Sequence, residues 1–232
     1  MKRSTDHIRT THTGSMPRPL ELMDSMRAMA AGEAYDVAAY ERALARHVAD
    51  TVRRQVEAGI DVVNDGECSK PSFNAYIGER LGGLAISPPP AGSSSSLGPI
   101  DLNGRDAKVF PDYYQTIVEN NPFKNVIRVP PRVCVGPISY IGQAKVARDI
   151  ANLKAGMAAA KADEGFLPSF SPIPMIENKY YATEEQFSIA HGEAMRNEYQ
   201  AILDAGLVLQ IDDPRMVSMW DSYPTWSLAE YR

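Results

Sequence analysis

One order of features occurs twice in this chain of 232 residues: a helical stretch, a glycine, an apolar strand and then carboxylates. The first copy reads Ala58-Gly-Ile-Asp-Val-Val-Asn-Asp-Gly-Glu67, and the second reads Ala205-Gly-Leu-Val-Leu-Gln-Ile-Asp-Asp-Pro214. Helices that alternate with apolar strands are typical of parallel α/β folds, which bind ligands at the carboxyl ends of their strands. The repeat therefore predicts two acidic strand ends on the same edge of one sheet.

The wider pattern predicts five strands that alternate with helices. The expected strands are residues 8–13, 60–64, 132–135, 166–170 and 207–211, and the third is expected to end at Gly136-Pro137. Apolar positions every four residues predict a helix over 36–58, and a similar stripe predicts one from about 146 to 160. Thr183-Glu-Glu-Gln186 is a capping box that begins a helix to Asp204. The fold class is α/β, a partial TIM-type (β/α)8 barrel with about five βα units.

We expect a single partial barrel domain over 1–232, with a Pro/Gly/Ser-rich insertion at about 84–130. Within it, residues 109–118 could form a short strand or a helix. A second capping box, Ser227-Leu-Ala-Glu230, opens a helix just before the chain ends. This favours a barrel cut short, and a frayed polar tail is the alternative.

Composition excludes several partners. No apolar run approaches the ~20 residues that span a bilayer, so no membrane partner is expected. The net charge is −5 and no dense Lys/Arg cluster occurs, which argues against nucleic acid. Two cysteines, Cys68 and Cys134, are too few for a disulfide scaffold and fit reduced thiols in a cytoplasmic protein.

Polar groups follow four of the predicted strands. They are His12 to Ser15, Asp65 with Glu67, Gly136 to Tyr140, and Asp212 with Asp213. Neighbouring carboxylates at a cleft can hold an ammonium group, ligate a metal or act as acid and base. A Gly-Ser turn offers N–H groups and a hydroxyl to a ligand carboxylate. Alternatively, each acid caps a turn or a helix.

The four histidines show no metal-ligand spacing. His12 alone lies near the predicted strand ends, where it could be catalytic or a hydrogen-bonded structural residue. His47 and His191 fall within predicted helices, and we expect them at the surface.

Five motifs in this order resemble the cobalamin-independent methionine synthase family, in its C-terminal catalytic barrel. They are Thr10-Thr-His-Thr-Gly-Ser-Met-Pro-Arg-Pro19, Gly59-Ile-Asp-Val-Val-Asn-Asp-Gly-Glu67, Tyr76-Ile-Gly-Glu79, Gly136-Pro-Ile-Ser139 and Leu209-Gln-Ile-Asp-Asp-Pro214. The first two are most similar to shorter, stand-alone relatives. The family's barrel also resembles uroporphyrinogen decarboxylase in architecture, although this chain carries none of that enzyme's motifs.

The resemblance implies methyl transfer from 5-methyltetrahydrofolate to homocysteine, which binds as a thiolate on zinc. It places Gly14 and Ser15 at the amino acid's carboxylate, and Glu67 and Asp212 at its ammonium group. The family's zinc ligands lie at the ends of strands six to eight, so no metal ligand is expected in this chain. Cys68 and Cys134 do not fall on ligand positions.

Two other functions remain open from the sequence. One is a different zinc-dependent thiol alkyltransferase on the same barrel, in which the region around Tyr140 and the insertion set the alkyl donor. The other is a non-catalytic partial barrel that binds a small ligand or a partner. Unpaired sheet edges would favour an oligomer or a complementing chain.

Overall fold

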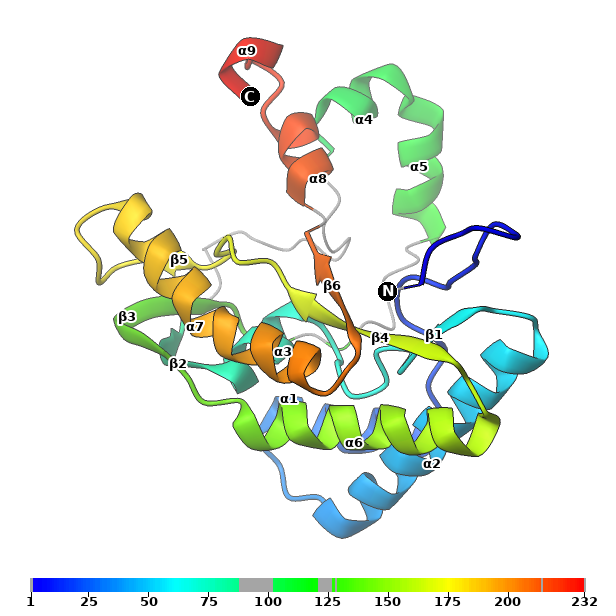
Figure 1. The fold of residues 1–232 in the computed structure, drawn as a ribbon. Helices are drawn as coiled ribbons and strands as arrows, with labels where there is room; N and C mark the ends of the chain where they lie inside the picture. The colour runs from blue at the N-terminus through cyan, green and yellow to red at the C-terminus, as the bar shows by residue number, and fades with distance from the viewer. Residues whose placement is uncertain (1, 88–101, 121–126, 128, 214, 232) are drawn as a thin grey trace. The chain divides into compact units, whose positions relative to one another are not determined.

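The computed structural model describes residues 2–87, 102–120, 127, 129–213 and 215–231 (Figure 1). The chain divides into two units, one formed by Met1–Pro88 with Ile127–Asp212 and the other by Pro89–Val126 with Asp213–Arg232. Among the described helices, none combines the length and apolar character that a membrane crossing requires.

A parallel sheet forms the centre of the first unit. Its strands are β1 (Val62–Asn64), β4 (Glu164–Phe170) and β6 (Val208–Asp212), with β4 between the other two. Both pairings are parallel, so the carboxyl ends of all three strands lie at the same edge. This confirms the prediction that the two repeated segments deliver their carboxylates to one side of a sheet.

The first predicted strand, 8–13, is reduced to a single parallel bridge between Thr11 and Val62. Next to this bridge, the backbone N–H groups of Asp61 and Val62 both donate to the carbonyl of Thr10. The segment follows the edge of β1 without forming a regular strand.

Helices α1 (Leu20–Ala31), α2 (Val37–Glu57), α3 (Phe73–Arg80), α6 (Gln143–Ala160) and α7 (Glu184–Asp204) accompany this sheet. The four-residue stripe predicted for α2 is confirmed, since the residues that it names at the helix centre are buried: Tyr40, Leu44, Val48 and Val52. The α2 stripe packs against α6, and Figure 1 shows these two helices crossing beneath β4.

Local signals set the ends of these helices. Asp36 accepts a hydrogen bond from the Ala39 N–H at 2.9 Å and begins α2, and Thr183 accepts one from Gln186 at 3.1 Å and begins α7. Gly59 and Gly206 follow α2 and α7 with φ of 80° and 78°, a left-handed conformation that glycine adopts without strain.

The prediction for the third strand was wrong about the sheet to which it belongs and about where it ends. This strand is β3 (Arg132–Tyr140), and it continues through Gly136-Pro137. It lies in a second sheet, antiparallel to β2 (Leu81–Ile86) and parallel to β5 (Glu177–Asn178). The pairing of β2 with β3 shifts register between Gly82 and Leu84, and this irregularity accommodates the Gly136-Pro137 segment of β3. Gly83 allows this approach, because a Cβ there would lie 2.5 Å from the Pro137 carbonyl oxygen. Residues 136–140 are therefore inside a strand and do not follow one.

The second unit contains α4 (Arg105–Val109), α5 (Pro111–Asn120), α8 (Arg215–Ser222) and α9 (Leu228–Tyr231). The Arg105 guanidinium lies 3.8 Å from the centre of the Trp220 ring and donates to the Trp220 carbonyl at 2.9 Å. The capping box at Ser227 is confirmed, since Ser227 N donates to Glu230 Oε2 at 2.8 Å. Residues 109–118, for which the sequence allows a strand or a helix, are helical except for Phe110, which separates α4 from α5.

The single domain with an insertion at 84–130 stays a prediction. Part of β2 falls within that range in the first unit, while α4 and α5 fall within it in the second. Residues 88–101, which include the Pro-Pro-Pro and Ser-Ser-Ser-Ser segments, lie outside the described residues.

Candidate functional site

A cavity lies at the carboxyl ends of the parallel strands, with about 430 Å³ of space between its atoms, part of which is open solvent. Its lining consists of Ser15, Glu67, Lys70, Pro71, Ser72, Tyr76, Pro168, Ser169, Phe170 and Asp212. Three predicted binding residues, Ser15, Glu67 and Asp212, thus come together from segments far apart in the sequence. Gly14 precedes Ser15 with φ of 92° and is not part of the lining.

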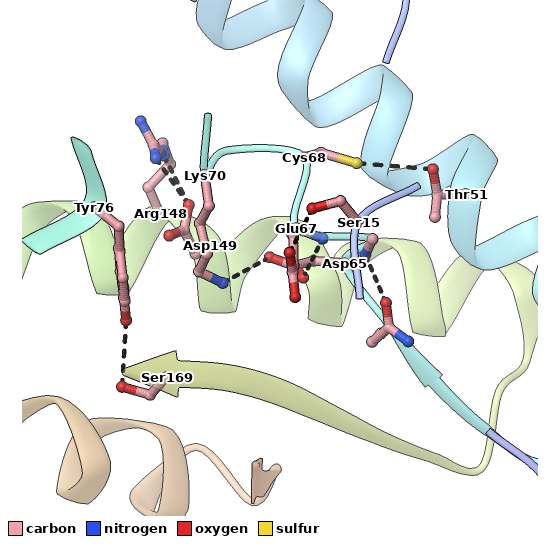
Figure 2. A network of polar contacts seen from close by, with 12 residues as sticks. Ser15, Thr51, Asp65, Glu67, Cys68, Lys70, Tyr76, Arg148, Asp149 and Ser169 are labelled. Atoms are coloured by element: carbon pink, nitrogen blue, oxygen red, sulfur yellow. Dashed lines mark hydrogen bonds and ion pairs between the residues drawn. The ribbon is translucent and has the colours of Figure 1, made fainter. Parts of the chain in front are cut away.

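Ser15 and Glu67 are hydrogen-bonded to each other. The Ser15 hydroxyl donates to Glu67 Oε2 at 2.5 Å (Figure 2). Arg18 holds the same two loops together, because its Nη2 donates to the carbonyl oxygens of Glu67 and Lys70 at 2.8 Å each. The loop after residue 13 and the loop after β1 therefore form one hydrogen-bonded wall.

Glu67 has φ of 53°, a left-handed conformation that is uncommon for a residue with a side chain. Asp65 stabilises it by accepting the Glu67 N–H at Oδ1, at 2.9 Å. This is the turn role that was weighed against a functional one for acids after strands. Asp65 takes the turn role and is buried, whereas the Glu67 side chain lines the cavity. Backbone strain of this kind concentrates at functional sites.

Lys70 is a cavity residue that sequence reasoning missed. Its ammonium group lies 3.4 Å from Asp65 Oδ2 and 5.6 Å from the centre of the Tyr76 ring. Only 9% of its side chain is exposed. The sequence feature that could have indicated it is its position in the polar loop that directly follows Asp65 and Glu67.

Behind the cavity wall lies a buried carboxyl group, Glu198 of α7, which is 1% exposed. The Tyr76 hydroxyl donates to Glu198 Oε1, and the Ser169 hydroxyl donates to the same oxygen at 3.0 Å. The Tyr140 hydroxyl donates to Oε2 at 2.6 Å. Burial raises the pKa of Glu198 to about 8, although the charge of Lys70 acts in the opposite direction.

Arg80, 2% exposed, joins Glu198 to a second buried acid. Its Nε lies 2.9 Å from Glu198 Oε2, and its Nη2 donates to Asp149 Oδ2 at 2.7 Å. Burial acts to raise the pKa of Asp149, but the charges of Arg148 and Arg80 outweigh it and hold that pKa below its usual value. Figure 2 shows the Arg148–Asp149 contact and the Tyr76–Ser169 contact in the same region.

Part of the chain that lines this cavity matches a known protein family. Residues 8–91, which carry Ser15, Glu67 and Lys70, match the family described as "Cobalamin-independent synthase, Catalytic domain". The chain is related to the cobalamin-independent methionine synthases. The resemblance predicted from the five motifs is thereby confirmed.

Two curated relatives illustrate the extent of this similarity. The 5-methyltetrahydropteroyltriglutamate–homocysteine methyltransferase of Actinobacillus pleuropneumoniae serotype 7 is 36% identical over 77 residues, which are 33% of this chain and 10% of that protein. The methionine synthase of Sulfolobus acidocaldarius is 26% identical over 209 residues, which are 88% of this chain and 51% of that protein. This chain thus spans about half or less of the length of these relatives.

Solved structures show the same fold. A B12-independent methionine synthase from Shewanella sp. W3-18-1, in complex with selenomethionine, superposes with a TM-score of 0.59 at 19% identity, covering 95% of this chain and 55% of that one. A putative enzyme of the same kind from Listeria monocytogenes gives a TM-score of 0.57 at 19% identity, covering 88% and 51%. The fold is thus a partial α/β barrel of the methionine synthase type, as predicted.

None of the four histidines lines the cavity that contains Ser15, Glu67 and Asp212. His12 lines a different cavity, between the N-terminal segment and α2, and its carbonyl accepts from Asn64 Nδ2 at 2.7 Å. His191 was expected at the surface, which is wrong: it is fully buried beside Phe170 and Phe187 and bonds the Pro172 carbonyl at 2.8 Å. Its face of α7 packs toward the sheet rather than toward solvent.

Zinc, which the methionine synthase resemblance implies, does not fit the side chains that the structure describes. Among those residues, no three His, Cys, Asp or Glu side chains gather as a metal-binding group. Both cysteines are buried, and burial raises the pKa of Cys68 to about 12 and that of Cys134 above its usual value. No step of the chemistry is therefore assigned to a metal in the part of the chain that the structure describes.

Proposed function

We propose that this chain binds the amino-acid thiol in a methionine-synthase-like methyl transfer, from 5-methyltetrahydrofolate to the sulfur of homocysteine, in the cytoplasm. The observation that carries the proposal is the cavity to which separate segments bring Ser15, Glu67 and Asp212. In this proposal the carboxylates of Glu67 and Asp212 bind the ammonium group. The backbone N–H groups at Gly14 and Ser15 face the carboxylate.

The hydrogen bonds around Glu67 suit such a role. Its main chain is held by Arg18 and Asp65, and its carboxylate is oriented by the Ser15 hydroxyl. A carboxylate held in place before the ligand arrives loses less conformational entropy on binding. Orientation of the amino-acid end in turn limits where the thiol sulfur can lie, which is the contribution of positioning to a transfer reaction.

The proposal is tested by calorimetric titration of the chain with L-homocysteine and with 4-sulfanylbutanoate, which lacks the amino group. We expect homocysteine to bind more tightly, and Asp212→Asn to remove most of that difference. Asp163→Asn, a change at an exposed aspartate (81% of the side chain) in the same unit, serves as the matched control. Equal binding of both thiols by the unchanged protein would contradict the assigned role of the carboxylates.

A second measurement addresses the reaction. Methionine formed from homocysteine and 5-methyltetrahydrofolate is quantified with zinc supplied in the buffer. Methionine formation that Asp212→Asn abolishes supports the full proposal. Preference for a thiol without an amino group would instead indicate a different thiol alkyltransferase, and binding without turnover would indicate a ligand-binding module.

A further inference from the structure

Lys70 is the positively charged side chain in the cavity lining that otherwise presents the carboxylates of Glu67 and Asp212. From this opposition of charges we infer that Lys70 binds the carboxylate of the ligand. The inference rests on the proposed function and assigns its second charged contact.

The position of Lys70 is set by its backbone. Its carbonyl oxygen accepts from Arg18 Nη2 at 2.8 Å, and its N–H donates to the Glu67 carbonyl at 2.9 Å. The same Arg18 atom lies 3.4 Å from the Ser15 hydroxyl oxygen. One guanidinium thus ties Lys70 to the Gly14–Ser15 turn, where the carboxylate is proposed to lie.

The ammonium group of Lys70 has capacity for another acceptor. Among the described residues its acid partner is Asp65, at the long distance of 3.4 Å, and the other oxygen of Asp65 is engaged by the Glu67 N–H. An ammonium group carries three donors. Because burial makes incomplete pairing of a charge costly, a ligand carboxylate would be stabilised here.

The Ser15 hydroxyl supplies an independent reason. Its single proton is donated to Glu67 at 2.5 Å, so in this arrangement that hydroxyl cannot also donate to a ligand. The carboxylate then requires another charged donor, and Lys70 is within the same lining. Ser72, which also lines the cavity, caps α3 by accepting the Ala75 N–H at 3.2 Å, so the positive end of that helix dipole lies at the same wall.

The test combines three variants with two thiols. Lys70→Met removes the charge at similar length, Lys70→Arg keeps it, and Lys154→Met changes an exposed lysine of α6 as the matched control. The thiols are L-homocysteine and 3-aminopropane-1-thiol, which lacks the carboxylate. Calorimetric affinities are measured for each pair, and thermal unfolding verifies that every variant is folded.

We expect Lys70→Met to weaken homocysteine binding by about ten- to hundred-fold, as for a lost charge-assisted hydrogen bond. The affinity for 3-aminopropane-1-thiol should change by less than about three-fold, because that ligand has no group for Lys70. Lys70→Arg should restore most of the homocysteine affinity, and Lys154→Met should change neither value. Equal weakening of both thiols, or unchanged homocysteine binding, would overturn the inference.

Failure of the proposed function gives a different result. If homocysteine does not bind the unchanged protein, the proposed function fails, and butanoate is titrated in its place as a simple carboxylate. Butanoate binding that Lys70→Met abolishes and Glu67→Gln preserves would retain the anion-binding role of Lys70. Absence of butanoate binding, or binding that Lys70→Met leaves intact, would overturn that role as well.

Discussion

Glu67 and Glu198 both accept hydrogen bonds from hydroxyl groups at the same cavity, but on opposite sides of its wall. Glu67 lines the cavity and accepts from Ser15, whereas Glu198 is 1% exposed and accepts from Tyr76 and Ser169, which themselves line it. The comparison teaches that burial separates two uses of one residue type. An accessible carboxylate can meet a ligand charge, and a buried one can only position the residues that do.

The charges around Glu198 agree with this division. Arg80 and Arg148 face Asp149, and Arg148 also pairs with Glu41 at 3.1 Å. Arg80 also lies 2.9 Å from Glu198 Oε2, so it faces both buried acids, but burial raises the pKa of Glu198 whereas the pKa of Asp149 is lowered. With a pKa of about 8, Glu198 retains its proton near neutral pH, and Asp149 is then the ionised acid beside Arg80.

The largest effect is expected from Arg80→Met, which removes the cation between the two buried acids. We expect a loss of about 3 kcal/mol in the free energy of unfolding, measured by urea denaturation, because the variant breaks the buried ion pair with Asp149 and the contact with Glu198. Arg196→Met, at an arginine of α7 whose side chain is 74% exposed, should change it by no more than about 1 kcal/mol. Similar losses for both variants would remove the distinction between buried and accessible charges.

Ligand affinity should depend more on the cavity residue Glu67 than on the buried residue Glu198. Glu67→Gln is expected to reduce the affinity for homocysteine by about 2 kcal/mol, the usual contribution of a hydrogen bond to a charged group. Its free energy of unfolding should stay within about 1 kcal/mol of the unchanged protein, since the carboxylate lies at the cavity. Calorimetry and urea denaturation of the same samples check both values. A Glu198→Gln variant that lost more affinity than Glu67→Gln would reverse the roles.

A smaller effect concerns pH. Because the pKa of Glu198 is raised to about 8, the folded chain retains a proton that the unfolded chain releases near pH 4.5. The contribution of this group to stability therefore falls as pH rises from about 4.5 to about 8 and is constant above that. Glu198→Gln should lack this fall, so its stability relative to the unchanged protein should improve across that range. A difference that does not vary with pH would contradict a protonated Glu198.

The smallest effect is expected at Cys68, the residue next to Glu67 in the sequence. Its thiol is fully buried, lies 3.8 Å from Thr51 Oγ1, and has a pKa raised to about 12 by burial. Iodoacetamide should label it in the folded chain far more slowly than in urea, as mass spectrometry would measure. Rapid labelling of the folded chain would contradict this expectation, because it would show that reagent reaches Cys68 in the loop after β1.

Short-range signals in the sequence were reliable where neighbouring residues interact. The caps at Asp36 and Thr183, the glycines after α2 and α7, and the apolar stripe of α2 predicted helices that the structure confirms. The predicted end and pairing of the strand that begins at Arg132 were wrong, because its partner, β2, lies in a segment without clear periodicity. Strand pairing depends on residues distant in sequence, and a bulge at Gly83 accommodates a proline that otherwise indicates a strand end.

By itself, the sequence determined that two apolar strands would each end in carboxylates, and the family resemblance of its motifs made Gly14, Ser15, Glu67 and Asp212 the candidate binding residues. Periodicity and turn chemistry are local properties, so they can be read along the chain. Only the tertiary structure decided that β4 separates the two strands, that Lys70 lies in the same cavity, and that Glu198 lies behind it. Burial and charge pairing arise between segments far apart in sequence, and they determine which acids meet a ligand.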